Sequence, residues 1–202
     1  RRFQMVKVDE PDDETACLML RGLKSRYAQH HGVHITDEAV RAAVTLSRRY
    51  LTGRQLPDKA VDLLDTASTR VRMSHDAVPE AITQLRARTD ALNMEKRAIL
   101  DDEALGGLIQ EARMHDILRE LASADERLEQ LELSWVAERE LTDRLLACRQ
   151  DASQQAHRAE LQSALHALQQ GEPLMTLDVD ARTVAGVIAD WTGVPLSSLM
   201  KD

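Results

Sequence analysis

The sequence predicts a mainly α-helical protein, in which a small helical domain is interrupted by an inserted antiparallel helical hairpin. Three observations predict this class. Aromatic residues make up only 2% of the 202 residues, while unbranched side chains that lose little rotamer freedom in a helix dominate. Apolar residues recur at helical spacing in several segments. One long segment, from Glu80 to about Gln170, contains no proline and carries leucine at heptad spacing.

The first eleven residues predict one short strand. Phe3, Met5 or Val6, and Val8 alternate with polar residues, and Pro11 ends the pattern. The chain opens without a methionine and without the apolar core of a signal peptide. We therefore expect it to be part of a longer protein.

Three helices are predicted after this strand. The first follows Asp12 or Asp13 as N-cap and is interrupted at Gly32. Thr36 caps the second, whose first turn is acidic. Pro57 stands in the first turn of the third, where its missing N–H costs nothing. The predicted core stripes of these helices are Ala16, Leu20, Leu23 and Tyr27; Val40, Ala43, Val44 and Ser47; and Ala60, Val61, Leu64, Ala67 and Val71.

Pro79 marks a boundary after which the character of the sequence changes. Charges alternate in sign, and the apolar seam is so narrow that it needs a partner helix to cover it. This predicts the antiparallel hairpin, with a break in the seam at Leu105–Gly107. The seam residues are Leu85, Leu92 and Ile99 before the break; Met114, Ile117, Leu121, Ala124, Leu128, Leu131 and Trp135 after it; and Leu141, Leu145, Leu161, Leu165 and Leu168 in a third helical stretch.

After Gly171–Leu174 the sequence predicts one more short helix. Asp180 is its N-cap, and Gly193 and Pro195 stop it. Its predicted buried stripe is Val184, Val187, Ile188 and Trp191. In the simplest arrangement this helix returns to the small domain after the insertion.

Composition excludes several classes of function. A formal net charge of -8 argues against a dedicated nucleic-acid-binding protein, which would need a basic face. No apolar run approaches the ~20 residues that cross a bilayer, so we expect no membrane insertion. Cys17 and Cys148 form no CxxC, and we interpret both as reduced packing residues of a cytoplasmic protein.

His30, His31 and His34 raise the question of a metal site. His30 and His34 have the i, i+4 spacing of two ligands on one helix face. Gly32 lies between them and predicts a break that takes them off one face, and no cluster of further ligands lies nearby. No metal site is predicted.

The sequence offers no catalytic machinery of its own. It contains neither a nucleophile elbow nor the phosphate-binding pattern GxxxxGK[ST]. Two basic spots remain: Arg1 and Arg2 beside the predicted strand, and Arg54 and Lys59 around a helix start, whose free N–H groups could hold an anion.

The strings RRFQMVKVDEP, HHGVHITDEAVRAAVTLSRRYLTGRQLPDKAVDLLDTA and ADWTGVP resemble the Hsp100/Clp group of AAA+ ATPases. The resemblance covers nearly the whole chain, and the order of its motifs is specific. It implies the end of the first ATPase module of a hexameric, ATP-driven unfoldase, with a helical AAA+ lid domain and an inserted antiparallel coiled-coil hairpin. The implied division is 1–11, the end of the large subdomain; 12–78, the first part of the lid; 79–171, the coiled-coil middle domain; and 172–202, the final lid helix and the linker to the second module.

Within the group, LLDTASTRVRMSHDAVP and VIADWTGVP look most like ClpV of bacterial type VI secretion. That resemblance implies a cytoplasmic bacterial protein that disassembles and recycles the contracted secretion sheath, with sheath proteins bound mostly outside this chain. ClpB disaggregases usually read Asp-Glu-Ala where this chain has Asp65-Thr66-Ala67, and their middle domain is longer, whereas ClpC also has a short one. A ClpB- or ClpC-type chaperone acting on aggregated or adaptor-delivered proteins is therefore an alternative, as is a purely protein-binding helical module.

The resemblance also implies site residues. Arg1 and Arg2 match the arginine fingers that reach the γ-phosphate bound in the neighbouring subunit, where they stabilise transition-state charge. Leu56, Pro57 and Asp58 match the lid turn that closes over the adenine end of the nucleotide. The implied cofactor is ATP with magnesium in the parent hexamer, and the middle domain is implied to make inter-subunit or regulatory contacts. The chain alone is expected to be inactive and to hold no cofactor tightly.

Overall fold

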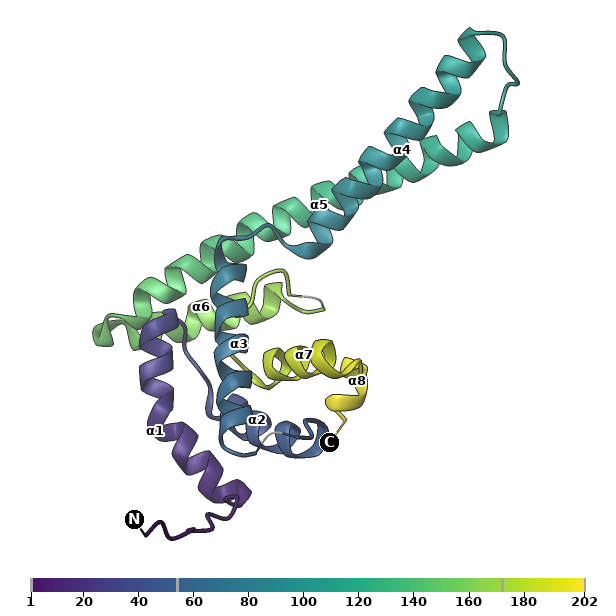
Figure 1. The fold of residues 1–202 in the computed structure, drawn as a ribbon. Helices are drawn as coiled ribbons and strands as arrows, with labels where there is room; N and C mark the ends of the chain where they lie inside the picture. Colours follow the sequence, from purple (N-terminus) through teal and green to yellow (C-terminus); the bar gives the residue numbers. More distant parts are fainter. Residues whose placement is uncertain (1, 54, 172, 202) are drawn as a thin grey trace. The chain divides into compact units, whose positions relative to one another are not determined.

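The computed structural model describes residues 2–53, 55–171 and 173–201. Within these residues the chain forms α-helices, one short 3-10 turn and no strand (Figure 1). The predicted fold class, a mainly α protein with an inserted antiparallel helical hairpin, is confirmed. None of the helices in this part of the chain is long and apolar enough to span a bilayer.

The chain divides into two compact units. Unit 1 comprises Arg1–Asp76 and Thr176–Asp202, and unit 2 comprises Ala77–Met175. The described residues of unit 1 form the helices α1 (Asp13–His31), α2 (Asp37–Tyr50), α3 (Asp58–Asp76), α7 (Ala181–Thr192) and α8 (Leu196–Leu199). Those of unit 2 form α4 (Glu80–Ala104), α5 (Glu111–Arg149), the 3-10 turn η1 (Ala152–Gln154) and α6 (Gln155–Leu168).

Capping side chains start three helices of unit 1 where the sequence predicts. Asp12, Thr36 and Asp180 each accept a hydrogen bond from the backbone N–H three residues on, at 2.8, 3.1 and 2.8 Å. Gly32 and Gly193 end α1 and α7 with φ of 68° and 75°, a left-handed conformation that glycine adopts without a steric penalty.

After the insertion, α7 returns to the first helices of unit 1. Val179 forms an isolated parallel bridge with Ile35: its N–H donates to the carbonyl of His34 at 2.9 Å, and its carbonyl accepts the N–H of Thr36 at 3.0 Å. This bridge brings the N-terminus of α7 beside that of α2, and α7 packs along α2 and α3. The core between them includes Leu20, Ile35, Val40, Val44, Leu63, Leu64, Val184 and Ile188, all fully buried.

In unit 2, α4 and α5 form the antiparallel hairpin. Arg113 at the start of α5 pairs with Glu95 near the end of α4 at 2.6 Å, and Arg88 pairs with Glu120 further back at 2.8 Å. The apolar cluster between the helices is Leu92, Ile99, Ile117 and Leu121, with Met114 against it. The remaining predicted seam residues of α5, Ala124, Leu128, Leu131 and Trp135, are buried or half-buried.

The third helical stretch is divided differently from the prediction. Leu141 and Leu145 belong to α5, which runs for 39 residues, and only Leu161, Leu165 and Leu168 lie on α6. Between the two helices Asp151 caps the 3-10 turn by accepting the N–H of Ser153 at 2.9 Å. This turn contains no glycine or proline. The leucine spacing therefore predicted one continuous helical stretch where the structure has two helices.

Two predictions for unit 1 are wrong. Residues 2–10 form no strand, because a strand needs a neighbour for its N–H and C=O groups, and the described residues offer none; Phe3, Met5 and Val8 are exposed. Trp191, predicted in the core, is 43% exposed. It lies in the last turn of α7, where the core ends and a hollow begins.

Candidate functional site

The turn between α2 and α3 holds the sequence-predicted lid residues in one short segment. Leu56 is buried in the core of unit 1, and its backbone N–H donates to Oε1 of Glu10 at 2.8 Å. Pro57, which follows a cis peptide bond, is half-buried. Asp58 is exposed and begins α3, where free N–H groups favour a negative charge. Pro57 and Asp58 therefore face outward from a turn that Leu56 anchors.

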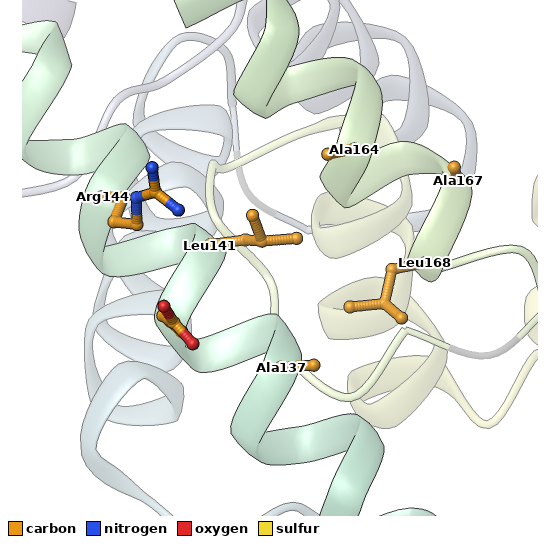
Figure 2. Close-up of a pocket in the computed structure, with 7 residues that line it drawn as sticks. Ala137, Leu141, Arg144, Ala164, Ala167 and Leu168 are labelled. Atoms are coloured by element: carbon orange, nitrogen blue, oxygen red, sulfur yellow. The ribbon is translucent and has the colours of Figure 1, made fainter.

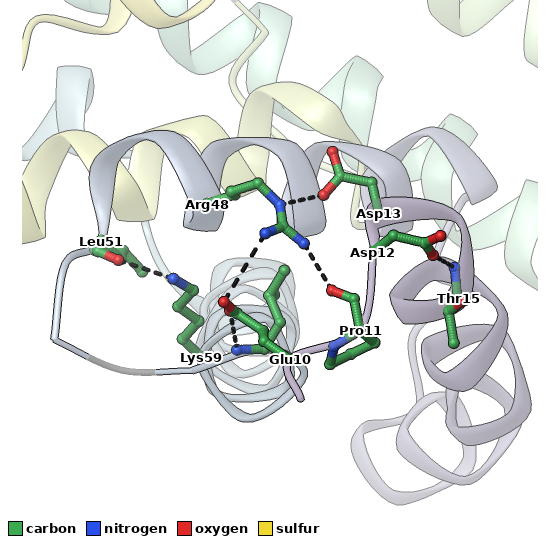
Figure 3. Close-up of polar contacts among 9 residues, drawn as sticks. Glu10, Pro11, Asp12, Asp13, Thr15, Arg48, Leu51 and Lys59 are labelled. Carbon is green, nitrogen blue, oxygen red and sulfur yellow. Dashed lines mark hydrogen bonds and ion pairs between the residues drawn. The ribbon is translucent and has the colours of Figure 1, made fainter. Parts of the chain in front are cut away.

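A network around Arg48 attaches the N-terminal segment to this turn (Figure 3). Arg48 on α2 donates to the carbonyl of Pro11 at 2.8 Å, pairs with Asp13, and lies 3.9 Å from Glu10. Glu10 in turn accepts the N–H of Leu56. Residues 10–13 are thereby fixed to α2 and to the turn, and Arg2 lies on the exposed segment that precedes them.

Lys59 connects the two ends of the turn. Its side chain is buried, and Nζ donates to the carbonyl of Leu51, the residue that caps the C-terminus of α2, at 3.0 Å. This bond satisfies a carbonyl that the end of the helix leaves free. No carboxylate among the described residues pairs with Lys59, and a buried cation of this kind favours an acceptor or anion nearby.

A hollow of about 190 Å³ opens beside this lysine. It is lined by Leu51, Thr52, Lys59 and Trp191. It combines a flat aromatic ring, an apolar side chain, a hydroxyl and an ammonium group. Complete small-molecule sites usually measure roughly 300–1,000 Å³. The hollow is therefore suited to be one wall of a binding site rather than a whole site.

The structure brings together some of the predicted site residues. Leu56, Pro57 and Asp58 are contiguous with the hollow through Lys59. Arg2 is exposed, whereas Arg1 and Arg54 lie outside the described residues. The sequence did not predict that Glu10 and Arg48 attach the N-terminal segment to the turn, or that Trp191 lines the hollow. Trp191 belongs to the family motif WTGVP, but no local pattern indicated that its ring is exposed.

The histidines follow the prediction in their backbone geometry. α1 ends at His31, and Gly32 separates His30 from His34. His31 Nε2 lies 2.7 Å from Oδ1 of Asp65, and its ring meets that of His30 edge to face with centroids 4.9 Å apart. Over the residues that the structure describes, no three ligand-type side chains are grouped so that they could hold a metal ion. His31 connects α1 to α3.

Comparisons with known proteins agree with this geometry. The model of the AAA lid domain family matches residues 12–117. The AAA+ ATPase ClpV1 of Pseudomonas aeruginosa is 41% identical over the whole chain, which spans 25% of that protein. The chaperone protein ClpB of Propionibacterium freudenreichii is 39% identical, again over the whole chain and 26% of its own length. The chain thus spans about a quarter of the length of these curated relatives.

A solved structure gives the same result for the fold. Hsp104 of Saccharomyces cerevisiae in complex with ADP matches with a TM-score of 0.52 and 26% identity, covering 100% of this chain and 33% of that one. The chain belongs to the AAA lid domain family and is the lid region of a Clp/Hsp104-type AAA+ protein.

Proposed function

We propose that the chain is the lid and middle region of the first ATPase module of a ClpV-type protein. This hexameric, cytoplasmic unfoldase uses ATP with magnesium to disassemble and recycle the contracted type VI secretion sheath. The hollow lined by Leu51, Thr52, Lys59 and Trp191, beside the Leu56–Asp58 turn, carries the proposal. The whole-chain identity to ClpV1 supports the choice within the group.

The domain division follows from the same proposal. Residues 12–78 and 172–202 would form the lid, 79–171 the middle domain, and 1–11 the end of the large subdomain. Support comes from the separation into two compact units, with boundaries at Asp76 and Thr176. Residues 2–9 lie exposed outside the core of unit 1, which agrees with their assignment to another subdomain.

In this proposal, each residue of the hollow makes a different contact with the nucleotide. The exposed ring of Trp191 offers a face on which adenine can stack, worth about 1–3 kcal/mol for a base on an aromatic side chain. Lys59 and Thr52 supply polar contacts at the rim, while Pro57 and Asp58 border the turn. Arg1 and Arg2 would act on the nucleotide of the neighbouring subunit by stabilising charge in the transition state. The phosphates would be held outside this chain.

Nucleotide binding tests the site. We would measure ADP binding to the full-length hexamer with its second module made unable to bind nucleotide. Trp191→Ala is expected to raise the Kd about 10-fold, the equivalent of roughly 1.4 kcal/mol. Met200→Ala, an exposed apolar residue of unit 1 outside the hollow, is the control. An unchanged Kd in Trp191→Ala would refute the site and favour a purely protein-binding module.

A substitution of Arg2 tests the proposed arginine-finger role in ATP hydrolysis. Arg2→Ala in the full-length hexamer is expected to lower ATP turnover on the order of 10³-fold, or somewhat less, while leaving ADP binding unchanged. Normal turnover in Arg1→Ala/Arg2→Ala would contradict the assignment.

The chain is nearly as similar to ClpB as to ClpV1, so the choice between a ClpV-type and a ClpB-type protein needs a test of the substrate. The full-length protein would be given preformed contracted sheath and, separately, a heat-aggregated protein, each with ATP. Disassembly of the sheath without reactivation of the aggregate is expected. Reactivation of the aggregate alone would select a ClpB-type disaggregase.

A further inference from the structure

The turn between α2 and α3 is held by a hydrogen bond to a residue far from it in the sequence. The backbone N–H of Leu56 donates to Oε1 of Glu10 at 2.8 Å, across 46 residues. Leu56 is buried, and the next residue, Pro57, has no N–H to offer. An N–H that loses its acceptor at a buried position is costly, so the carboxylate of Glu10 fixes the backbone of the turn at Leu56.

Glu10 is also the point at which the N-terminal segment becomes attached to unit 1. The exposure of the side chain falls from 87% at Asp9 to 35% at Glu10. Arg48 of α2 supports the same position, because it donates to the carbonyl of Pro11 and pairs with Asp13 (Figure 3). A proline restricts the backbone of the residue before it, so the direction of the chain at Glu10 is fixed as well.

Of the two contacts of the Glu10 carboxylate, the one to Leu56 is the stronger. Oε2 of Glu10 lies 3.9 Å from the guanidinium of Arg48, which is beyond hydrogen-bond distance. An ion pair between partly exposed side chains contributes little. The acceptor oxygen of Glu10, rather than its net charge, therefore connects the N-terminal segment to the turn.

We propose that Glu10 is a positioning residue that couples the nucleotide-binding turn of a subunit to the arginine fingers of the same subunit. This inference rests on the proposed function, which places the Leu56–Asp58 turn at the subunit's own nucleotide and Arg2 at that of its neighbour. Residues 3–9 alone separate Arg2 from Glu10. A shift of the turn displaces Glu10 and the start of this segment. Because a finger stabilises the transition state only when it is correctly placed, the state of one site changes turnover at the next.

ATP turnover by the full-length hexamer, with its second module unable to bind nucleotide, measures the two effects separately. Glu10→Ala is expected to raise KM, because the turn is displaced, and to lower kcat on the order of 10-fold, because the fingers are misplaced. In the Arg1→Ala/Arg2→Ala background the loss of kcat should disappear while the rise in KM remains. An equal fold-loss of kcat in both backgrounds would overturn the coupling, as would unchanged kcat and KM in Glu10→Ala.

Two further variants test whether the acceptor oxygen is responsible. Glu10→Gln keeps an oxygen acceptor for the N–H of Leu56 and is expected to retain most of the turnover. A loss equal to that of Glu10→Ala would contradict the hydrogen bond as the connection. Asp9→Ala removes the adjacent, exposed carboxylate and should leave kcat and KM unchanged. An effect as large as that of Glu10→Ala would contradict the role of Glu10.

Amide exchange in the 202-residue chain, followed by NMR, tests the contact in the absence of nucleotide. Glu10→Ala is expected to speed the exchange of the Leu56 N–H on the order of 10-fold. The control is Leu168→Ala, at a residue that lines the groove between α5 and α6 of unit 2 (Figure 2); it should leave the exchange of Leu56 unchanged. Unchanged exchange in Glu10→Ala, or equal acceleration in Leu168→Ala, would overturn the inference.

Failure of the proposed function gives a different result. Normal turnover in the Arg1→Ala/Arg2→Ala background, or an unchanged Kd for ADP in Trp191→Ala, would refute the function on which the coupling rests. Loss of turnover in the former and weaker ADP binding in the latter, together with no effect of Glu10→Ala, would refute the coupling alone.

Discussion

The carboxylate of Glu138 accepts the backbone N–H of Leu174 with its two oxygens at 3.1 and 3.3 Å, across 36 residues of sequence. Glu138 is 2% exposed, and Leu174 lies where the chain leaves unit 2. Gln169 adds a bond to the carbonyl of Met175 at 2.8 Å. These hydrogen bonds offset part of the hydration that the buried carboxylate loses, so Glu138 and the exit segment hold one another in place.

Unit 2 is expected to carry a pH dependence from this glutamate. Burial raises the pKa of Glu138, and the N–H of Leu174 offsets only part of the effect. The folded chain then binds this proton more tightly than the unfolded chain, so the contribution of Glu138 to stability falls as pH rises above about 4.3. Glutamine does not ionise, so Glu138→Gln removes this pH dependence. The free energy of unfolding of Glu138→Gln, minus that of the unsubstituted chain, should therefore be more favourable at pH 7 than at pH 4.

Urea unfolding at several pH values, followed by circular dichroism, measures this difference. Glu129→Gln, an exposed glutamate on the same helix, corrects for the loss of one negative charge. A relative stability of Glu138→Gln that falls as pH rises would show that burial does not dominate at Glu138.

The start of α2 should depend on pH in the opposite sense. Arg21 donates to both oxygens of Asp37, at 2.6 and 3.1 Å. With Arg41 as a weaker contributor, this lowers the pKa of Asp37 to about 2. Because the pKa is lower in the folded state, the stabilisation is present above about pH 3.9 and is lost as pH falls toward 2. Arg21→Ala should therefore raise the pKa of Asp37 toward its ordinary value.

NMR titration of the Asp37 carboxyl carbon measures that pKa directly. Arg26→Ala, an exposed arginine on the same helix, should leave it unchanged. If the pKa stayed near 2 in Arg21→Ala, the guanidinium of Arg21 would not be its main cause.

Lys59 should contribute to stability independently of any ligand. Lys59→Ala leaves the carbonyl of Leu51 without its donor, which costs about 1–3 kcal/mol for a buried group. Lys59→Met keeps the packing of the aliphatic stem and should recover part of that loss. Urea unfolding gives both values. Lys7→Ala, on an exposed side chain, should change stability by less than about 0.5 kcal/mol, and an equally small effect of Lys59→Ala would contradict the assignment.

Sequence alone predicted the features that depend on near neighbours. The caps Asp12, Thr36 and Asp180 act on N–H groups three residues away, and helical spacing marks the faces that α2 and α7 bury. The missed features depend on distant partners. Arg48 meets Pro11 across 37 residues, and the exposure of Trp191 depends on where the other core helices end.

The candidate site likewise depends on residues that are distant in the sequence, which limits how much of it the sequence can predict. Leu56, Pro57 and Asp58 could be placed through the family motif, but the hollow beside them needs Leu51 and Trp191 from the ends of two other helices. No local pattern connects these positions. The strand predicted at residues 3–8 failed for a related reason, because pairing requires a second strand that periodicity cannot supply.

The α4–α5 hairpin should unfold while unit 1 stays folded. Ile117 is fully buried in the cluster with Leu92, Ile99 and Leu121, so Ile117→Asp buries an unpaired carboxylate, at a cost of several kcal/mol. Unit 1 has its own core and should be unaffected. Hydrogen exchange followed by mass spectrometry should show lost protection over 80–149 and retained protection over 13–76. Leu118→Asp, at the adjacent position and 47% exposed, is the matched control and should leave both units protected. Simultaneous loss of protection in both units of Ile117→Asp would mean that they fold as one cooperative structure.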